Sequence, residues 1–468
     1  MARTKLIAVG TLAVMLAGCR LATPPSRTDT VADALPKTTT IPLQWSVPTE
    51  TTNVADDWLE SFNDPRLVAL VAEAQANNLD LRQAAARVEA ARQTVVVVAS
   101  RLKPQIGFQL GAGATVDDGP GGVSSGSSLL IGIAWEPDIW GRIRAQRAAS
   151  EAGYHATALD YAWARQSLAA TTAKTWYLAV ESHQLLVFAQ SVVGIYSQLQ
   201  ELVTVRRAAG KVTDLDVAEA SASLNTAESQ LRGAESRNQD VSRALELLLG
   251  RYPSAEIEVA ANFVPVPPPV AAGLPASLIE RRPDVLAAEQ QVLQAFRNEE
   301  AAKLARLPSF SLGLGGGRLD NGVLSLLDLN PWLARAAVGM SVPIYTGGEL
   351  TARINIADAR QLEAIAAYGN VVIHAYGEAE TALTSESLLA QRLEFDQAAE
   401  RDRTEAVRVS RIQYKAGATD LLSVLQLQAD QIASTVRVIQ LRNAQLANRI
   451  DLHLALGGSF DAEPATAR

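Results

Sequence analysis

The chain has 468 residues, a formal net charge of −8 at pH 7 and a single cysteine. The negative charge gives no electrostatic reason to expect a nucleic-acid partner, and one cysteine excludes an internal disulfide framework. Aromatic residues make up 5% of the chain while alanine is abundant, which favours long, closely packed helices over a bulky globular core.

Residues 1–18 are predicted to be an export signal, with Arg3 and Lys5 at its basic start. Its apolar run is too short to span a bilayer as a helix. The segment Leu16-Ala17-Gly18-Cys19 resembles a bacterial lipobox, which implies that Cys19 becomes an N-terminus carrying diacylglycerol and an N-acyl chain, with no other cofactor. The alternative is an ordinary signal peptide with a chance cysteine. Arg20 follows, so the aspartate of the inner-membrane retention signal is absent.

Residues 19–55 are predicted to form an acylated tether. Beyond the cysteine this segment is rich in Thr, Pro, Ser and Asp and has no apolar periodicity. Such a composition is typical of an extended linker rather than a packed element.

The rest of the chain contains a tandem repeat. When Pro104 is aligned with Pro308, small and apolar residues on both sides fall into register, and the offset drifts only from 204 to 207 along the repeat. A slowly drifting register indicates an internal duplication. The chain then divides into repeat 1 (residues 56–250), a proline-rich connector (251–275), repeat 2 (276–460) and a C-terminal tail (461–468).

Each repeat is predicted to begin with a helix, over residues 79–103 and 283–306. Two alternating segments follow in each repeat: 105–115 and 128–136 in the first, 309–317 and 333–342 in the second. Their lengths are close to the roughly ten residues that a tilted transmembrane strand requires, and their apolar residues share one parity, as Ile131 and Ile133 do. A half-buried strand pair in a soluble sandwich would give the same alternation.

A long helical hairpin completes each repeat, over residues 139–249 and 346–456. Neither hairpin contains a proline, and each is interrupted mainly at a glycine, Gly210 or Gly417. The first arm of about 70 residues would be roughly 100 Å long, too long for the core of a compact domain. Apolar residues on the returning arms recur at steps of three and four, which indicates a left-handed coiled-coil seam. The seam residues are Val217, Ala220, Leu224, Ala227, Leu231, Ala234, Asn238, Val241, Leu245 and Leu248, and then Leu422, Leu425, Ala429, Ile432, Val436, Ile439, Asn443, Leu446 and Ile450.

The strands of one chain cannot close a barrel, because their edges would leave backbone groups unpaired in lipid. Three chains would supply twelve strands, an even number and a barrel wider than the eight-stranded kind that side chains fill. The predicted fold is therefore a mixed α and β membrane protein. It is a homotrimer with a 12-stranded transmembrane β-barrel, four strands per chain, continued by a long coiled-coil α-barrel.

Short motifs along the chain resemble those of the TolC-type outer membrane factors. They are Trp58 with Phe62-Asn63-Asp64-Pro65, Asn78-Leu79-Asp80-Leu81, Trp135-Glu136-Pro137-Asp138-Ile139-Trp140-Gly141, Leu274-Pro275 with Arg281-Arg282-Pro283-Asp284, Pro343-Ile344-Tyr345 with Gly347-Gly348, and Tyr414-Lys415-Ala416-Gly417. With the lipobox, they are most similar to the lipoprotein subclass that includes OprM-like exit ducts of resistance-nodulation-division pumps. The resemblance covers about residues 55–460.

This resemblance implies a trimeric duct in the bacterial outer membrane, lipid-anchored and extending into the periplasm. It would passively conduct drugs or other small molecules to the exterior, with a periplasmic adaptor (membrane fusion) protein and an inner-membrane resistance-nodulation-division transporter as partners. The same architecture fits a conduit for type I protein secretion, and a third interpretation is a non-conducting structural lipoprotein scaffold. The lipobox favours small-molecule efflux.

The resemblance places both hairpin turns at the periplasmic tip, where the adaptor docks. Gly210 and Gly417 are expected to take positive φ at a helix end. Cations crowd both turns and are the predicted adaptor contacts: Arg206, Arg207, Lys211, Arg411 and Lys415. The alternative is that they are ordinary cations at helix C-termini.

The resemblance also implies a closed gate near the second turn. Tyr414 and Leu422 match the tyrosine and leucine of the family, whereas Ser423 and Gln426 stand where TolC-like proteins tend to carry aspartates. An acidic ring would then come from Asp420, or from Asp216 and Glu219 in repeat 1. Carboxylates gathered around a threefold axis would repel one another and bind cations.

No pattern of enzyme chemistry stands out. The histidines His155, His183, His374 and His453 are scattered without metal-ligand spacing, and the serine run at Ser124-Ser125 has no histidine or aspartate partner nearby in sequence. The sequence therefore predicts neither an enzyme nor a metal site.

Overall fold

The computed structural model describes residues 21–49, 56–116, 123–320 and 333–459. The predicted signal peptide (1–18), Cys19 and the tail (461–468) lie outside them. The chain divides into two compact units, and each unit draws on both repeats. Unit 1 comprises Met1–Thr39, Ala85–Asp160 and Asp284–Val371; unit 2 comprises Thr40–Ala84, Tyr161–Pro283 and Val372–Arg468.

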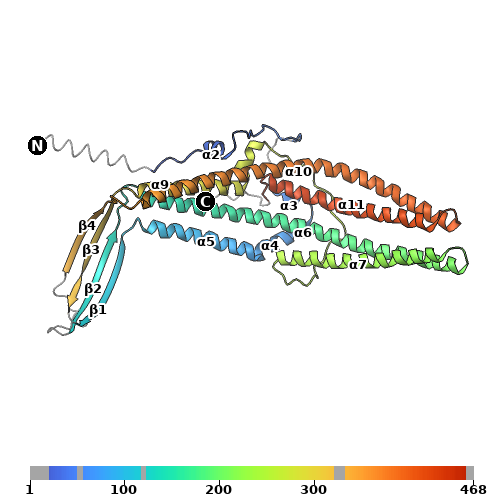
Figure 1. The fold of residues 1–468 in the computed structure, drawn as a ribbon, viewed down its shortest axis with the longest axis horizontal. Coiled ribbons are helices and arrows are strands. Elements are labelled where there is room, and N and C mark those ends of the chain that lie inside the picture. The colour runs from blue at the N-terminus through green and yellow to red at the C-terminus, as the bar shows by residue number, and fades with distance from the viewer. Residues whose placement is uncertain (1–20, 50–55, 117–122, 321–332, 460–468) are drawn as a thin grey trace. The chain divides into compact units, whose positions relative to one another are not determined.

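Unit 1 contains an antiparallel sheet with the strand order β1-β2-β3-β4, visible side by side in Figure 1. The strands are β1 (Gln105–Val116), β2 (Val123–Trp135), β3 (Ser309–Asp320) and β4 (Leu333–Ser341). All four predicted strands are confirmed, although β2 begins at Val123 rather than at residue 128. The added residues are mostly Ser and Gly, so they carry no apolar alternation. Backbone pairing with β1 orders them, as between Ser125 and Ala114.

The soluble-sandwich interpretation of these strands is wrong. One face of the sheet carries Ile106, Phe108 and Val338, whose side chains are 75%, 65% and 79% exposed. A sandwich would cover that face with a second sheet, and the described residues contain no strand besides these four. The apolar face is therefore left for a partner outside the chain.

A helix precedes each strand pair and a long helix follows it. The first helix of each repeat is confirmed as α5 (Leu79–Ser100) and α9 (Pro283–Leu304), each ending a few residues before its predicted end. The long helices α6 (Arg142–Ala208) and α10 (Glu349–Ala416) follow β2 and β4. Asp138 fixes the start of α6, because its carboxylate accepts hydrogen bonds from the backbone N–H groups of Ile143 and Arg144 at 3.0 and 2.9 Å.

Both predicted helical hairpins are confirmed. α7 (Asp214–Leu248) returns from α6, and α11 (Leu421–Ala455) returns from α10 (Figure 1). The seam predicted on α7 is buried or half-buried throughout. On α11 the prediction is wrong at Leu422 and Ala429, which are exposed, because the first turns of this helix bury the neighbouring stripe of Leu421, Val424 and Gln428.

The turns follow the chemistry expected of glycine C-caps. Gly210 and Gly417 have φ angles of +68° and +81°, which residues with a side chain adopt at a cost. In the first turn the backbone N–H of Lys211 donates to the carbonyl of Arg206 at 2.9 Å, and the second turn contains the equivalent bond at 2.9 Å. These bonds satisfy carbonyl groups that the helix end leaves unpaired.

The core of unit 2 is built around the middle of α6. Trp176 packs there with α3 (Trp58–Ser61) and α4 (Pro65–Asn77), two helices that the sequence analysis missed. Asp64 joins the two parts: its Oδ1 caps α4 through the N–H of Leu67 at 3.1 Å, and its Oδ2 accepts from the indole N–H of Trp176 at 2.8 Å. The motif around Asp64 is thus structural.

The connector and the elements after it are short. Residues 251–274 contain neither helix nor strand, as predicted. They lead into η1 (Pro275–Ser277) and α8 (Leu278–Arg281), directly before α9.

The prediction of an extended tether is wrong for residues 21–49. This segment forms α2 (Arg27–Ala34), with a capping box between Ser26 and Asp29. In unit 1, Arg27 pairs with Glu289 at 2.9 Å. In unit 2, Trp45 is 7% exposed and donates its indole N–H to the carbonyls of Ala272 and Gly273. Composition alone missed these anchors, because isolated docking contacts have no sequence period.

Candidate functional site

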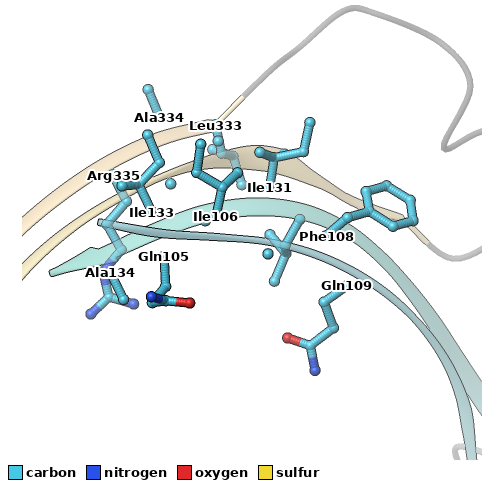
Figure 2. Close-up of a pocket in the computed structure, with 16 residues that line it drawn as sticks. Gln105, Ile106, Phe108, Gln109, Ile131, Ile133, Ala134, Leu333, Ala334 and Arg335 are labelled. Carbon is cyan, nitrogen blue, oxygen red and sulfur yellow. The ribbon is translucent and has the colours of Figure 1, made fainter. Parts of the chain in front are cut away.

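The sheet has two chemically different faces. The strand register places large apolar residues together on one face: Ile106, Phe108, Leu110, Leu129, Ile131, Ile133, Trp135, Phe310, Leu312, Leu314, Ala336, Val338 and Met340. The other face is mostly small and polar, with Leu130 and Leu333 as its large apolar members. Its small and polar residues include Gln105, Gly107, Gln109, Gly111, Gly113, Gly126, Ser128, Gly132, Ser309, Ser311, Gly313, Gly315, Gly317, Arg335 and Gly339. In Figure 2, Ile106 and Ile133 lie on one side of the strands, while Gln105 and Gln109 lie on the other. An apolar-out, polar-in division of this kind is the signature of a membrane barrel.

Glycines on the polar face differ in how closely the neighbouring atoms approach them, and Gly317 is sterically required because a Cβ there would meet the backbone. A Cβ added at Gly317 would lie 2.0 Å from the carbonyl oxygen of Leu129, and one at Gly339 would lie 2.6 Å from Oγ of Ser311. A Cβ at Gly107, in contrast, would meet nothing within 4 Å. The strands arch in Figure 2 with Gln105 and Gln109 inside the arch, so the crowded face is the concave one. The small residues allow the sheet to curl toward that face.

The outer edges of the sheet are open within the chain. β1 pairs only with β2, and β4 pairs only with β3, among the strands that the structure describes. In a bilayer the outer N–H and C=O groups of β1 and β4 would each lack a partner. The sheet therefore requires further copies of itself to pair both edges.

At the hairpin turns, unit 2 brings together one predicted adaptor contact and one predicted gate residue. Tyr414 is 4% exposed and packs with Val203 of α6 and Leu421 of α11. The guanidinium Cζ of Arg206 lies 4.5 Å from the centroid of the Tyr414 ring, and its Nη1 donates to the Tyr414 carbonyl at 2.6 Å. Burial raises the pKa of the Tyr414 hydroxyl. The neutral ring thus presents its face to a cation.

The other predicted tip cations have different surroundings. Arg207 forms a two-pronged ion pair with Asp214, with Nε–Oδ1 and Nη2–Oδ2 distances of 2.6 and 2.9 Å. Arg411 donates to the side-chain amide of Gln428 on α11. Lys211 and Lys415 are exposed. The lysines are therefore the cations most accessible to a partner. Arg206 links the two turns, whereas Arg207 and Arg411 each bind a partner within their own hairpin.

Two of the three predicted acidic gate residues, Asp420 and Asp216, take part in capping a helix. Asp420 accepts from the backbone N–H of Ser423 at 2.7 Å, and its hydrogen bonds with Ser423 lower the pKa of its carboxyl group. Asp216 forms a capping box with Thr213. Glu219 is half-buried. The carboxylates of Asp216 and Asp420 thus lie at the starts of the two returning helices.

The remaining gate candidates differ in exposure. Leu422 is 59% exposed and Gln426 is also exposed, while Ser423 is half-buried. Leu422 thus lies on the surface of α11, away from the buried cluster that contains Tyr414. Sequence reasoning missed the Arg206–Tyr414 contact, because the two residues lie in different repeats and no local signal connects them.

The motif residues that suggested the family have structural roles. Arg282 is 2% exposed, donates to Glu378 at 2.6 Å and lies over the ring of Trp163 with its Cζ 4.8 Å from the ring centroid. Trp140 donates its indole N–H to the carbonyl of Pro308 at 2.7 Å, beside the start of β3. These motifs therefore fix connections between the two repeats.

The N-terminal end of the described chain is held in unit 1. The backbone N–H of Ala22 donates to Oε1 of Glu300 at 2.6 Å, and Arg297 donates to the Ala22 carbonyl at 2.7 Å. Arg297 and Glu300 also pair with each other at 2.7 Å, and both side chains are 12% exposed. Cδ2 of Leu21 lies 3.4 Å from the position that a Cβ on Gly141 would take, six residues after the end of β2. This clamp on Ala22 is a second feature that sequence reasoning missed.

Among the described residues there is no group of three or more His, Cys, Asp or Glu side chains positioned to hold a metal ion. One histidine is buried against aromatic rings: His453 is stacked on Trp58 with ring centroids 5.7 Å apart. Burial, with Arg449 nearby, lowers the pKa of His453 to about 3.

A two-faced sheet with open edges, followed by long helical hairpins, defines a protein that builds a membrane barrel from several chains. Residues 70–251 and 274–458 match the family described as outer membrane efflux protein, and the chain belongs to that family. The pyoverdine export outer membrane protein OpmQ of Pseudomonas putida is 29% identical over 442 residues, which are 91% of this chain and 93% of that protein. The toluene efflux pump outer membrane protein TtgF of the same species is 28% identical over 433 residues, 90% of each chain.

The fold agrees with solved structures. The CmeC outer membrane channel of Campylobacter jejuni superimposes with a TM-score of 0.85 over 96% of each chain, at 21% identity. The chain therefore has the fold of the trimeric outer membrane factor channels, with four strands per chain contributed to the β-barrel and the long helices to an α-barrel. It is an outer membrane protein and the exit duct of an efflux pump, which confirms the predicted family, fold and location.

Proposed function

We propose that this duct carries small molecules that a periplasmic adaptor and an inner-membrane resistance-nodulation-division transporter deliver to it. The observation that carries the proposal is the sheet face lined by glycine, serine and glutamine, such as Gly315 and Gln109, which leaves open, wettable space inside a closed barrel. The names of the relatives give pyoverdine and toluene as their cargo, and neither name refers to a secreted protein.

Deleting the gene distinguishes this function from type I protein secretion, which the same architecture would serve. Small-molecule efflux predicts greater sensitivity to dyes, antibiotics or solvents, restored by the wild-type gene. Loss of an exported protein with unchanged sensitivity would instead support the secretion function. A scaffold without a pore would show neither change, and the purified trimer would give no conductance in a planar bilayer.

In this proposal the adaptor docks at the hairpin turns. Lys211 and Lys415 support this, because both are exposed next to the turns formed by Gly210 and Gly417. Exchanging both lysines for glutamate should abolish crosslinking to the adaptor while the trimer still assembles. Unchanged crosslinking would remove the lysines from the docking surface.

The proposed gate comprises Tyr414, Leu422, Ser423 and Gln426, with Asp420, Asp216 and Glu219 as its acidic members. The exposure of Leu422 and Gln426 supports contact with other copies of the chain around the threefold axis. The caps at Asp216 and Asp420 place carboxylates where both returning helices begin. A cation blocker applied at the tip side should lose affinity when Asp420 is changed to asparagine.

Acylation of Cys19 is part of the proposal. The clamp on Ala22 and the position of Leu21 beside Gly141 support it, because they hold the chain close to the end of β2. Leu21 follows Cys19 by two positions in the sequence. Mass spectrometry of the mature N-terminus should find the acyl chains, and Cys19→Ser should remove them.

A further inference from the structure

The polar face of the sheet carries one formal charge among the side chains that the structure describes on it. That charge is the guanidinium of Arg335, on β4. Its row across the sheet consists of Gly315, Gly132 and Gly107, as the strand pairing shows. Three neighbouring positions without side chains leave the guanidinium room to extend over the concave face.

Among the residues that the structure describes, no carboxylate shares the face of the sheet on which Arg335 lies. The Arg335 side chain is exposed, and it lines an open concavity of about 880 Å³ together with Gln105, Gln109, Leu130 and Leu333 of the same face (Figure 2). The described positions of this face hold only Gly, Ala, Ser, Gln, Leu and Arg335. Arg318, the other arginine on a described strand, has the opposite parity and lies on the apolar face opposite Leu129.

Closing the trimer places three copies of Arg335 around one lumen. A twelve-stranded barrel with strands about 4.8 Å apart and tilted by about 40° has a backbone radius of roughly 12 Å. An arginine side chain spans much of that radius. At about 0.01 M salt the Debye length is about 30 Å, so the three charges act across the whole lumen; at about 1 M it is about 3 Å and their field is screened.

We propose that Arg335 forms a ring of three cations inside the barrel that makes the duct favour anionic solutes over cationic ones. This inference rests on the duct function and adds a charge preference to it. Rings of basic side chains are a general means by which pores prefer anions. The ring acts on whatever solute reaches the barrel, so it is a filter at the membrane in addition to any selection by the pump.

The reversal potential of the purified trimer in a planar bilayer tests the inference, with a salt gradient centred near 0.01 M. The wild-type protein should prefer chloride over potassium, Arg335→Gln should abolish the preference, and Arg335→Glu should reverse it. Arg318→Gln removes the same charge from the lipid-facing side and is the matched control, so it should behave like the wild type. At about 1 M salt the charge preferences of all variants and of the wild-type protein should become alike, because the field of Arg335 is screened. Equal reversal potentials for wild-type protein and Arg335→Gln at low salt would overturn the inference.

A second measurement covers the case in which the tips stay shut and little current flows. A cysteine placed at Gln109, on the same face, can be modified from outside the cell by anionic or cationic thiol reagents. At about 0.01 M salt the anionic reagent should react roughly tenfold faster relative to the cationic one, and Arg335→Gln should bring that ratio near one. If the ratio of the two reaction rates is the same in the presence and absence of Arg335, the inference is refuted, even where conductance shows that the duct is functional. If neither modification nor conductance is observed, the duct function itself is refuted instead.

Discussion

Arg206 and Tyr414 hold the ends of the two helical hairpins together within one chain. The Arg206 guanidinium covers the Tyr414 ring at 4.5 Å and donates to the Tyr414 carbonyl at 2.6 Å. This carbonyl lies in the last turn of α10, where carbonyl groups lack helical partners and a nearby cation is favourable. Movement of one hairpin end away from the other must break both contacts.

Replacing Arg206 by alanine should therefore favour opening of the tips. The lost ring contact and charged hydrogen bond amount to about 2 kcal/mol per chain, enough to shift an equilibrium more than tenfold. Single-channel conductance in planar bilayers should rise accordingly. Arg207→Ala is the matched control, because Arg207 pairs with Asp214 inside its own hairpin turn. Equal conductance of Arg206→Ala and the wild type, or an equal rise in Arg207→Ala, would contradict this role.

Glycines on the concave face of the sheet should differ sharply in their tolerance of a methyl group. Gly317→Ala would place a Cβ 2.0 Å from the Leu129 carbonyl oxygen and should prevent β2 and β3 from pairing, so that the trimer does not assemble. Gly107→Ala meets nothing within 4 Å and should assemble normally. The amount of SDS-resistant trimer in outer membrane fractions measures both. Normal assembly of Gly317→Ala would show that the sheet relaxes around the added atom.

The repeat, the strands and the hairpins could be predicted because each leaves a period or a landmark in the sequence. The alternation of Ile131 with Ile133 and the glycines at positions 210 and 417 are such local signals. The long-range contacts that hold these elements together leave no such signal. Trp45 on the carbonyl of Ala272 joins residues more than 200 positions apart and leaves no local pattern.

The same distinction applies to the candidate site. Sequence reasoning selected the tip cations as a group, but it could not separate Arg206, which binds Tyr414, from Lys211, which is exposed. Sequence reasoning also did not select Arg335, because the role of a single arginine in a strand cannot be inferred before the strand register shows on which face of the sheet it lies. Register depends on pairing between strands, and that pairing is decided by the whole sheet.

Asp64 should contribute more to stability than a surface carboxylate. It caps α4 and accepts the buried indole N–H of Trp176 at 2.8 Å. Asp64→Ala removes the cap, at about 1 kcal/mol, and leaves the indole N–H without its acceptor, at about 1–3 kcal/mol. The midpoint of thermal unfolding of the purified protein should fall by several degrees. Glu60→Ala, at an exposed neighbouring position, should leave the midpoint unchanged, and a similar fall there would point to a general charge effect.

His453 should make the folded chain less stable as the pH falls from neutral toward 5. Burial lowers its pKa from 6.5 to about 3, so between these values the unfolded chain binds a proton at this position and the folded chain does not. The free energy of unfolding therefore rises with pH in this window, by up to about 1.4 kcal/mol per pH unit per chain.

His453→Leu removes the titrating group from an environment of Trp58 and Phe62 rings. The difference in urea midpoint between pH 5 and pH 7 should accordingly shrink in this variant. His183→Leu, which changes a histidine outside this cluster, is the control. An unchanged pH dependence in His453→Leu would mean that other groups, such as the nearby Arg449 with its Glu386 partner, govern acid stability.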